Sequence, residues 1–262
     1  MTKIISISNQ KGGVGKTTTA VNLSSCLATA GKSVILIDSD PQANASTGLG
    51  IDAKDKINTV YEVIISETKL KSCLVDTEIE KLKLVPSNIN LVGAELELVD
   101  FESRERQLKN KITEYLYDTD AGFKLPDFII IDCPPSLSLI TVNALTAADS
   151  VLIPVQCEYY ALEGLTQLLN TIKMVKNTFN PSLNIEGYLL TMFDSRLRLA
   201  NQVESELRNV FGDKVYQTKI ARNVKIGEAP SYGKPINLYE PMSTGAKNYT
   251  ELSTEFLQRN SN

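Results

Sequence analysis

A glycine- and lysine-rich segment near the start of the chain has residue types suited to phosphate chemistry. It runs from Asn9 to Thr18 and reads Asn-Gln-Lys-Gly-Gly-Val-Gly-Lys-Thr-Thr. Closely spaced glycines let successive backbone N–H groups turn toward one anion, and a helix that begins just after them adds its positive end. Lys16 would then neutralise the β- and γ-phosphates of a nucleotide, and the Thr17 hydroxyl would bind Mg²⁺. We therefore predict a nucleotide-binding loop made of Lys11, Gly12, Gly13, Val14, Gly15, Lys16, Thr17 and Thr18.

The loop departs from the pattern G-x-x-x-x-G-K-[ST] at one position, where Gln10 replaces the first glycine. It also carries a second lysine, Lys11. One alternative is a glycine-rich turn with incidental lysines. Another is half a dinucleotide-binding fingerprint, in which the Gly-Val-Gly run is followed by Asp38 after the second strand. Thr18 stands at the third glycine of that fingerprint, and a dinucleotide site has no use for the Lys-Thr pair, so we favour a nucleoside triphosphate.

Three aspartates follow apolar runs that read as strands. Asp38 and Asp40 lie in Leu-Ile-Asp-Ser-Asp-Pro-Gln, and Asp132 ends the run Phe-Ile-Ile-Ile-Asp. A lone aspartate at a strand end is often a cap or a turn residue, but ligands of parallel sheets bind outside the carboxyl ends of the strands. We predict that Asp132 and Asp38 join Thr17 as the metal site, as in a Walker B arrangement. Asp40, with Lys11 and Lys16, is a predicted catalytic residue that orients the attacking water.

The elements that must position these residues alternate between strands and helices. Predicted strands are Lys3–Ser8, Val34–Asp38, Lys83–Pro86, Phe128–Asp132, Val151–Val155, Glu186–Thr191 and Val215–Ile220. Predicted helices are Lys16–Ala30, Asn90–Tyr117, Leu137–Ala147, Leu162–Thr178, Ala200–Val210 and Gly245–Leu257. Several strands are continuous apolar runs, as expected when both faces are covered. We predict an α/β fold with a doubly wound, mostly parallel sheet and helices on both faces, in a single domain spanning residues 1–262.

Composition excludes several kinds of chemistry. The 262 residues include no histidine and no tryptophan, so histidine acid–base catalysis and zinc–histidine sites are excluded. The four cysteines are widely spaced, with no CxxC, and read as free thiols. No apolar run is long enough to cross a bilayer, and no signal-peptide pattern is present, so we expect a soluble, cytoplasmic protein.

Charge is unevenly distributed along the chain. The net charge is −4, but residues 187–250 hold nine lysines and arginines against six acids. A basic region on an acidic body indicates a local anionic partner.

These motifs together resemble the deviant Walker A P-loop ATPases, and among them the ParA/Soj family of chromosome- and plasmid-partitioning proteins. The resemblance covers nearly the whole chain. Its motifs are Lys11–Thr18, Asp38–Gln42, Ile131–Ser136, Pro154–Gly164, Thr191–Arg196, Ile220–Val224 and Glu228–Ile236. It implies a Mg²⁺-dependent ATPase that forms an ATP-dependent sandwich homodimer, in which Lys11 crosses to the partner's phosphates and Gly12 must stay small.

The resemblance also implies further contacts. Adenine would be held by the segment that includes Ala221 and Asn223, where relatives often have proline in place of Ala221. The dimer would bind double-stranded DNA without sequence preference and associate with the nucleoid. Its hydrolysis would be stimulated by the basic segment of a ParB-type centromere-binding protein. The matching DNA-binding residues are Arg196 and Arg222, with Arg198, Lys225 and Lys247 as neighbours.

Three related functions compete with this interpretation. A membrane-associated positioning ATPase of the MinD type would need an amphipathic anchor, and the tail Glu251–Asn262 lacks a basic amphipathic face. No membrane partner is therefore expected. An iron–sulfur reductase of the nitrogenase iron-protein type would need a second cluster ligand beside Cys133. A non-hydrolysing nucleotide sensor would have no use for Asp40.

Overall fold

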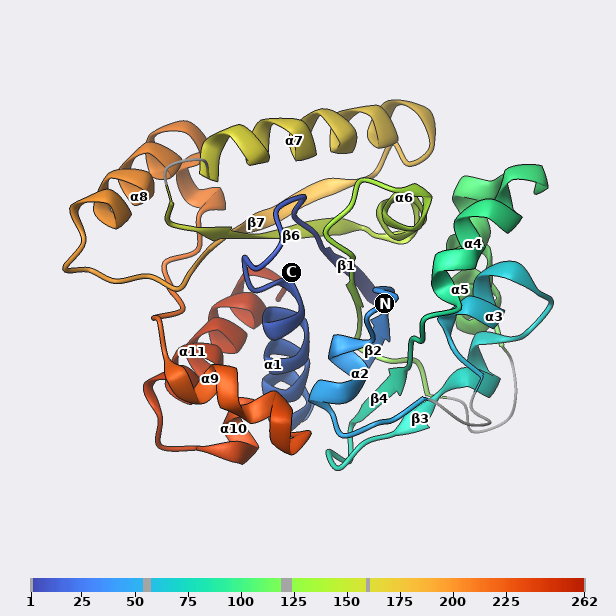
Figure 1. Ribbon diagram of the computed structural model, residues 1–262, viewed down its shortest axis with the longest axis horizontal. Coiled ribbons are helices and arrows are strands. Elements are labelled where there is room, and N and C mark those ends of the chain that lie inside the picture. The colour runs from blue at the N-terminus through green and yellow to red at the C-terminus, as the bar shows by residue number, and fades with distance from the viewer. Residues whose placement is uncertain (1, 54–57, 119–123, 159–160, 262) are drawn as a thin grey trace.

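The computed structural model describes residues 2–53, 58–118, 124–158 and 161–261, without the side chains of residues 161–163. Within them, one sheet has the strand order β3-β4-β2-β5-β1-β6-β7 (Figure 1). Its strands are Lys3–Ile7 (β1), Val34–Asp38 (β2), Val75–Asp76 (β3), Leu82–Val85 (β4), Phe128–Asp132 (β5), Ser150–Gln156 (β6) and Asn184–Thr191 (β7). All pairs are parallel except β3 with β4. The predicted doubly wound, mostly parallel α/β fold is confirmed.

Both faces of the sheet are buried, and successive side chains alternate between them. In β2, Ile35 and Ile37 belong to one core cluster, whereas Val34 and Leu36 belong to the other. Burial on both faces explains why the strands read as continuous apolar runs rather than as alternating ones.

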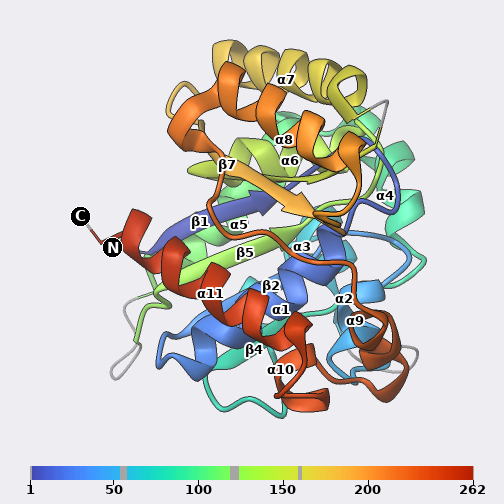
Figure 2. The same cartoon turned by 90° about the vertical axis from the view of Figure 1, so that its left-hand side faces the viewer.

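Helices cover each face as a separate layer (Figure 2). One face packs against Val60–Ile65 (α3), Leu91–Glu97 (α4), Gln107–Leu116 (α5), Leu139–Ala147 (α6), Ala161–Thr178 (α7) and Arg198–Phe211 (α8). The other packs against Lys16–Thr29 (α1), Asn44–Gly48 (α2), Val224–Glu228 (α9), Ile236–Tyr239 (α10) and Thr244–Arg259 (α11). Short 3₁₀ turns lie at Leu70–Cys73 (η1), Leu98–Asp100 (η2), Arg104–Arg106 (η3), Gly212–Lys214 (η4) and Ala229–Tyr232 (η5). None of the described helices combines the length and the apolar character needed to span a membrane.

The predicted continuous helix over Asn90–Tyr117 is wrong. The chain instead forms α4, breaks through η2 and η3 with Ser103 at φ 54°, and resumes as α5. A side chain from α6 stabilises the break: Asn143 accepts a hydrogen bond from the Leu108 N–H at 3.2 Å and donates one to the Arg104 carbonyl at 2.8 Å. The apolar spacing stays in phase across the break, so periodicity alone could not reveal it.

The predicted strand over Val215–Ile220 is also wrong. Only its ends bond to β7, through Tyr216 N–H to Tyr188 O and Ile220 N–H to Leu190 O, both at 2.9 Å. Two of the three N–H groups between them, of residues 217 and 218, donate to the Glu255 carboxylate on α11 at 2.9 and 2.8 Å. This carboxylate draws the middle of the segment away from the sheet.

The sheet brings the carboxyl ends of β1, β2 and β5 together. Asp38 pairs in register with Asp132, and Asp132 pairs with Ile7, the last residue of β1, two positions before the glycine-rich loop begins. The fold therefore places the loop and the aspartates at one edge of the sheet, as the sequence predicts.

Candidate active site

The glycine-rich loop joins β1 to α1, which begins at Lys16. Gly13 and Gly15 adopt φ values of 74° and 88°, a region that residues with side chains rarely enter. Thr191, at the end of β7, holds the loop from the side by donating a hydrogen bond to the Val14 carbonyl at 2.8 Å. No side chain caps α1, so its first N–H groups stay directed at the loop and available to an anion.

Lys16 is buried beneath this loop, and its ammonium donates a hydrogen bond to the Lys11 carbonyl at 3.0 Å. Burial lowers the pKa of Lys16, while the nearby carboxylates of Asp132 and Asp40 oppose that shift. A buried cation with two carboxylates close by is suited to bind the phosphates of a metal–nucleotide complex, because the phosphate charge offsets its desolvation.

Asp132 is fully buried, and among the described residues neither of its carboxylate oxygens has a hydrogen bond of normal geometry, although the nearby Thr17 side chain acts to lower its pKa. Burial raises its pKa well above the ordinary value, and the neighbouring Asp38 raises it further. Unpaired buried carboxylate oxygens are costly unless a ligand satisfies them. Mg²⁺ commonly takes one or two carboxylates together with phosphate oxygens and water. The site therefore fits a magnesium–nucleotide complex, although no cluster of three or more acidic, cysteine or histidine side chains forms a metal site within the described chain.

Asp38 is held more firmly than Asp132. It accepts hydrogen bonds from the backbone N–H and hydroxyl of Ser46, at 2.8 and 2.7 Å, and from the Asp40 N–H at 3.2 Å. Burial nevertheless raises its pKa to about 6. In this structure Asp38 anchors α2 against the end of β2, and its role as a metal ligand stays a prediction.

Asp40 lies just beyond β2 and is 6% exposed. One of its oxygens accepts a hydrogen bond from the Gln42 N–H at 2.9 Å, which fixes the carboxylate in the lining of a pocket of about 610 Å³. A carboxylate fixed beside a phosphate site is well placed to orient water.

This pocket extends from the glycine-rich loop to the segment at residues 220–223 and thereby joins residues far apart in sequence. It is lined by Gly12, Gly13, Gly15, Lys16, Thr17, Thr18, Asp40, Gln42, Asn44, Pro135, Thr191, Met192, Ile220, Ala221, Arg222, Asn223, Ile226, Gly227, Pro230 and Tyr249. Sequence reasoning missed Gln42, Thr191 and Met192. Thr191 ends a predicted strand, so the rule that ligands bind at carboxyl ends could have found it.

The predicted adenine residues, Ala221 and Asn223, line the same pocket as the glycine-rich loop. Asn223 caps α9 by accepting a hydrogen bond from the Lys225 N–H at 2.8 Å, which leaves its side-chain amide N–H₂ for other contacts. The Asn248 side-chain oxygen, on α11, accepts a hydrogen bond from the Ala221 N–H at 3.1 Å. These contacts fix the backbone of a segment that lines the pocket, and its role in binding adenine stays a prediction.

Lys11 does not point into the pocket. Its ammonium pairs with the carboxylate of Glu158, which follows β6. Gly12 beside it is exposed, and a methyl group there would lie 4.0 Å from Pro135. The need for glycine at this position therefore does not arise from crowding within this chain.

The predicted DNA-binding residues come from elements on one side of the molecule, at the left of Figure 1. They are Arg196, Arg198, Arg222, Lys225 and Lys247, and all are exposed. The Arg196 guanidinium pairs with Asp194 at 2.7 Å, and Arg222 also contributes to lowering the pKa of that carboxyl to about 2. Lys225 pairs with Glu228 at 2.7 Å. The Arg222 backbone N–H donates to the Phe193 carbonyl at 3.2 Å, so Arg222 lies near the Asp194–Arg196 pair.

Comparison with known proteins identifies the family. The family profile described as AAA domain matches residues 2–185. Soj, a sporulation initiation inhibitor protein of Bacillus subtilis, is 54% identical over 97% of this chain and 98% of its own. The chain belongs to the ParA/Soj family of partitioning ATPases. The Myxococcus xanthus chromosome partitioning protein ParA shares 50% identity with this family member, over 98% of this chain and 88% of its own.

A solved structure shares the fold of this ParA/Soj family member. It is cobyrinic acid a,c-diamide synthase from Mycobacterium smegmatis with bound ADP and magnesium, which is 35% identical, covers 100% of this chain and 96% of its own, and has a TM-score of 0.84. The similarity supports the P-loop fold described above. Tyr159 and Tyr160, part of the motif that indicated the family, lie outside the described residues.

Proposed function

We propose that this partitioning ATPase hydrolyses ATP to ADP and phosphate with Mg²⁺, as a homodimer that forms in the ATP state. The dimer binds double-stranded DNA without sequence preference and acts with a ParB-type centromere-binding protein to segregate a chromosome or plasmid. The observation that carries the proposal is the pocket that joins the glycine-rich loop, Lys16, Asp40 and the segment at 221–223. Asp132, with unpaired buried oxygens, lies at the same sheet edge.

The residues divide the work of phosphoryl transfer between them. Backbone N–H groups of the loop and the Lys16 ammonium hold the phosphates, and Asp132 with the Thr17 hydroxyl holds Mg²⁺, which neutralises developing charge when bound. Asp40 orients the attacking water. Asp38 contributes to the metal site directly or through Ser46, which it anchors.

Dimerisation supplies what one chain lacks. Lys11, here paired with Glu158, is the cation that would cross to the phosphates of the second copy. Exposed Gly12 would lie where the two loops face each other. A cation supplied by a partner can couple hydrolysis to assembly. The ADP-bound or free chain would then be monomeric, and each copy in the dimer would add its basic residues to one DNA-binding surface.

The test combines a variant that blocks ATP hydrolysis with a measurement of the oligomeric state. Asp40→Ala should hydrolyse ATP at least about 100-fold more slowly while keeping nucleotide affinity, because the carboxylate acts on water rather than on the nucleotide. The variant should accumulate as a dimer with ATP and as a monomer with ADP, and only the dimer should retain plain duplex DNA. Asp76→Ala, on exposed β3, is the control.

Other outcomes would contradict the proposal. If Asp40→Ala hydrolysed ATP at the rate of the parent protein, Asp40 would not be a catalytic residue. Equal DNA affinity with ATP and with ADP would show that DNA binding does not depend on which nucleotide is bound. Binding to anionic vesicles rather than DNA would favour a membrane-positioning ATPase of the MinD type.

A further inference from the structure

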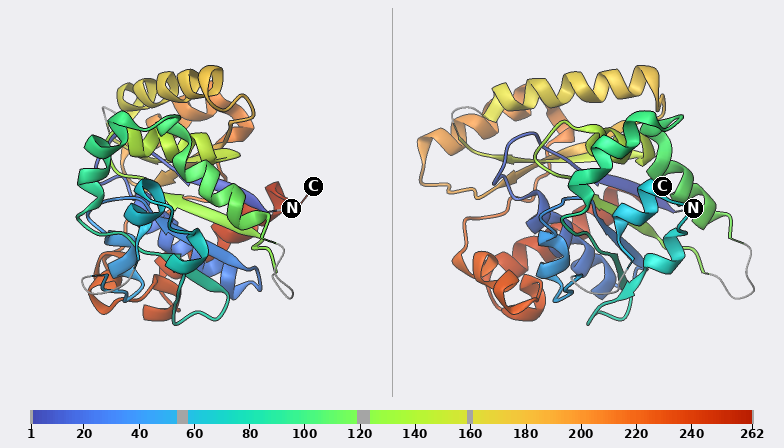
Figure 3. Two further views of the ribbon diagram at one scale, coloured as in Figure 1. Left: turned by 90° about the vertical axis from the view of Figure 1, so that its right-hand side faces the viewer. Right: turned by 45° about the vertical axis from the view of Figure 1, so that its right-hand side comes forward.

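A chain of buried hydrogen bonds connects α2 with the end of β2 and the loop after β4. Ser46 on α2 donates its backbone N–H and its hydroxyl to one carboxylate oxygen of Asp38, Oδ2, at 2.8 and 2.7 Å. The hydroxyl oxygen in turn accepts a hydrogen bond from the Ser87 N–H at 3.1 Å. Asp38 and Ser87 are fully buried, and Ser46 is 1% exposed. In Figure 1 and in the right-hand view of Figure 3, α2 lies beside the end of β4, as these contacts require.

The direction of each hydrogen bond in this chain is fixed. A backbone N–H can only donate, so the Ser46 hydroxyl oxygen must accept from Ser87. The single proton of that hydroxyl is then donated to the Asp38 carboxylate. Ser46 therefore supplies two donors to the same oxygen of Asp38, which fixes the orientation of the carboxylate and leaves its second oxygen for other contacts.

The second oxygen of Asp38, Oδ1, holds the backbone of the predicted catalytic residue. It accepts a hydrogen bond from the Asp40 N–H at 3.2 Å. Because β2 ends at Asp38, Asp40 lies beyond the hydrogen bonds that join the strands. Its carboxylate is held separately, by the Gln42 N–H at 2.9 Å. The position of the Asp40 backbone thus depends on Asp38, and the orientation of Asp38 depends on Ser46.

We propose that Ser46 is a positioning residue of the candidate active site. It keeps the Asp38 carboxylate in one orientation, Asp38 fixes the Asp40 backbone, and the Asp40 carboxylate then orients the attacking water. Removing a group that supports a reacting residue in this way commonly lowers the rate about 10- to 100-fold. The inference rests on the proposed function for its effect on turnover, but not for its effect on the N–H groups of Asp40 and Ser87.

Steady-state kinetics of three variants test the effect on turnover. Ser46→Ala should lower kcat about tenfold or more, whereas the KM for ATP should stay within about twofold of the parent value. This split is expected because Ser46 acts on the residue that orients water and is not among the described residues that line the nucleotide pocket. Ser46→Thr keeps a hydroxyl and should recover most of the lost kcat. The control is Ser24→Ala on α1, which also removes a fully buried hydroxyl, but one without a hydrogen-bond partner among the described residues, so its kcat should equal that of the parent.

Amide hydrogen exchange without nucleotide tests the same network independently of turnover. In Ser46→Ala the N–H groups of Ser87 and Asp40 should exchange at least about tenfold faster than in the parent, because the first loses its acceptor and the second loses a fixed one. The Ile37 N–H, within β2, should change less, whereas a general loss of stability would speed all three alike. If the proposed ATPase function fails but this inference holds, no variant will hydrolyse ATP and the exchange pattern will remain.

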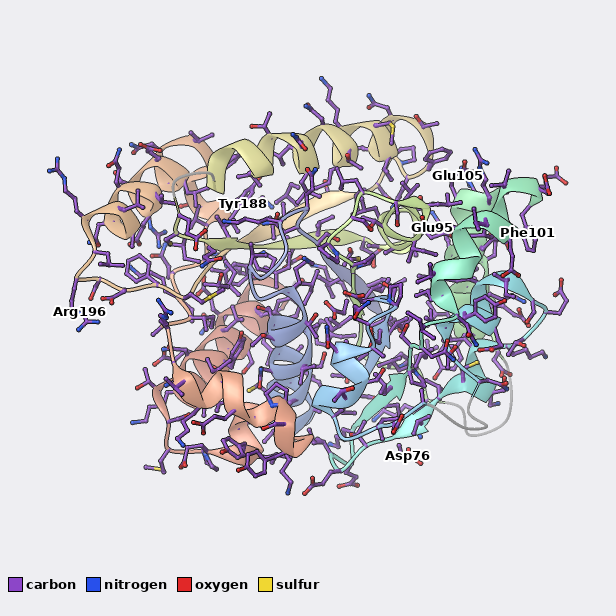
Figure 4. All side chains as sticks on the ribbon, in the orientation of Figure 1. Asp76, Glu95, Phe101, Glu105, Tyr188 and Arg196 are labelled. Atoms are coloured by element: carbon purple, nitrogen blue, oxygen red, sulfur yellow. The ribbon has the colours of Figure 1, made fainter. Side chains whose placement is uncertain are left out.

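Two checks separate this effect from misfolding and from damage to the predicted DNA-binding side. Thermal unfolding shows whether each variant is folded at the assay temperature. If Ser46→Ala is not, Ser46→Cys takes its place with the same expected result, because the thiol fills the space but is a weak donor. Figure 4 places Arg196 at the left edge of the molecule, whereas α2 lies near the centre of the same view in Figure 1. Ser46→Ala should therefore bind duplex DNA with ATP as tightly as the parent.

Three results would overturn the inference. Ser46→Ala could hydrolyse ATP at the parental rate. Ser46→Thr could be as slow as Ser46→Ala, which would show that the hydroxyl is not responsible. Alternatively, exchange of the Asp40 N–H could stay at its parental rate while kcat falls, which would show that Ser46 does not act through Asp38 on Asp40.

Discussion

The Lys11 ammonium of the glycine-rich loop is paired with the Glu158 carboxylate at the end of β6, within one chain. Lys11 is the residue proposed to reach the phosphates of a second copy. Within one chain its ammonium is engaged by Glu158, a contact that it would have to give up to bind phosphate. Dimer formation would exchange this pair, whose side chains are 35% and 49% exposed, for a contact with phosphate.

Glu158→Gln should strengthen ATP-dependent dimerisation by about two- to tenfold. An exposed ion pair contributes roughly 0–1 kcal/mol, and each dimer exchanges two of them. The stability of the monomer should barely change for the same reason. Sedimentation equilibrium with ATP, in the Asp40→Ala background, measures the dimerisation constant. Glu114→Gln is the matched control, because Glu114 is also 49% exposed and pairs with a lysine. A weaker dimer in Glu158→Gln would show that Glu158 supports assembly.

Gly12→Val should prevent ATP-dependent dimerisation without affecting the folding of the monomer. A Cβ at Gly12 would meet only ordinary contact with Pro135 and the residue is exposed, so monomer stability should stay within about 0.5 kcal/mol of the parent. ATP binding should also persist, whereas dimerisation and turnover should fall at least about 100-fold, because two loops could no longer approach. Thermal unfolding, nucleotide titration and sizing measure the three properties. Gly13→Ala provides the contrast, since φ 74° makes it strained and should weaken nucleotide binding itself. Normal dimers of Gly12→Val would contradict the face-to-face arrangement.

Asp132→Asn should weaken Mg²⁺-dependent ATP binding by at least about tenfold and stabilise the free protein at alkaline pH. Burial raises the pKa of Asp132, so the parent loses stability as pH rises through that folded-state pKa, and asparagine removes the loss. The difference in unfolding free energy should grow as pH rises above the ordinary carboxyl value of 3.8, because the unfolded state ionises there while the buried carboxyl of the folded state stays protonated. Urea unfolding without nucleotide measures it, and titration of ATP with and without EDTA measures the metal dependence. Equal ATP affinity of both proteins in Mg²⁺ would exclude Asp132 from the metal site.

Arg196→Ala should reduce the dependence of DNA binding on salt. Each arginine that contacts phosphate adds close to one to the slope of log affinity against log salt, so a dimer should lose about two. Affinity should fall on every duplex sequence alike, and ATP-dependent sizing should be unchanged. Fluorescence anisotropy at several salt concentrations provides the slope. Lys69→Ala, 74% exposed and outside the 187–250 basic region, should behave as the parent. An unchanged slope would leave Arg196 as a surface residue paired only with Asp194.

The sequence predicted the sheet well because its strands are covered on both faces. Continuous apolar runs such as Phe128–Asp132 are typical of buried parallel strands. Because parallel strands end on the same side of the sheet, Asp38 and Asp132 come to the same edge. The wrong helix and strand predictions lie where a side chain that is distant in sequence determines the local backbone conformation. Asn143 from α6 stabilises the break between α4 and α5, and Glu255 from α11 draws residues 217 and 218 off the sheet.

The same distinction applies to the candidate site. Residues of the glycine-rich loop could be found because their spacing is local, and Asp40 because it follows a predicted strand. Gln42, Met192 and Glu158 could not be placed, since their positions depend on how four loops meet at the sheet edge. Asp38 and Asp132 are both fully buried but differ in hydrogen bonding: Asp38 accepts three hydrogen bonds, whereas the Asp132 oxygens have none of normal geometry within the described residues. A sequence motif does not distinguish those two states.

Glu186→Gln should destabilise the free protein and flatten its response to acid. The side chain of Glu186 is 5% exposed and joins the two ends of the chain, which lie side by side in Figure 2. It accepts hydrogen bonds from Lys3 at 2.8 Å, Ser150 at 2.6 Å and Asn260 at 2.8 Å. Burial opposes its ionisation, but these donors outweigh burial and lower its pKa below the ordinary 4.5.

A lowered carboxylate pKa gives stability that is present above the unfolded-state pKa and is lost as pH falls through the folded-state value. The parent should therefore lose stability as pH falls below about 4.5, the unfolded-state pKa of this carboxyl. At pH 7, Glu186→Gln should be less stable than the parent by about 1–3 kcal/mol. The stability of the variant should also change less than that of the parent over the acid range. Urea unfolding at pH 7 and across the acid limb measures both quantities. Glu114→Gln, exposed on α5, should reproduce the parent curve. If Glu186→Gln kept the full acid slope, other carboxylates would account for it, and the network at the chain ends would contribute only packing.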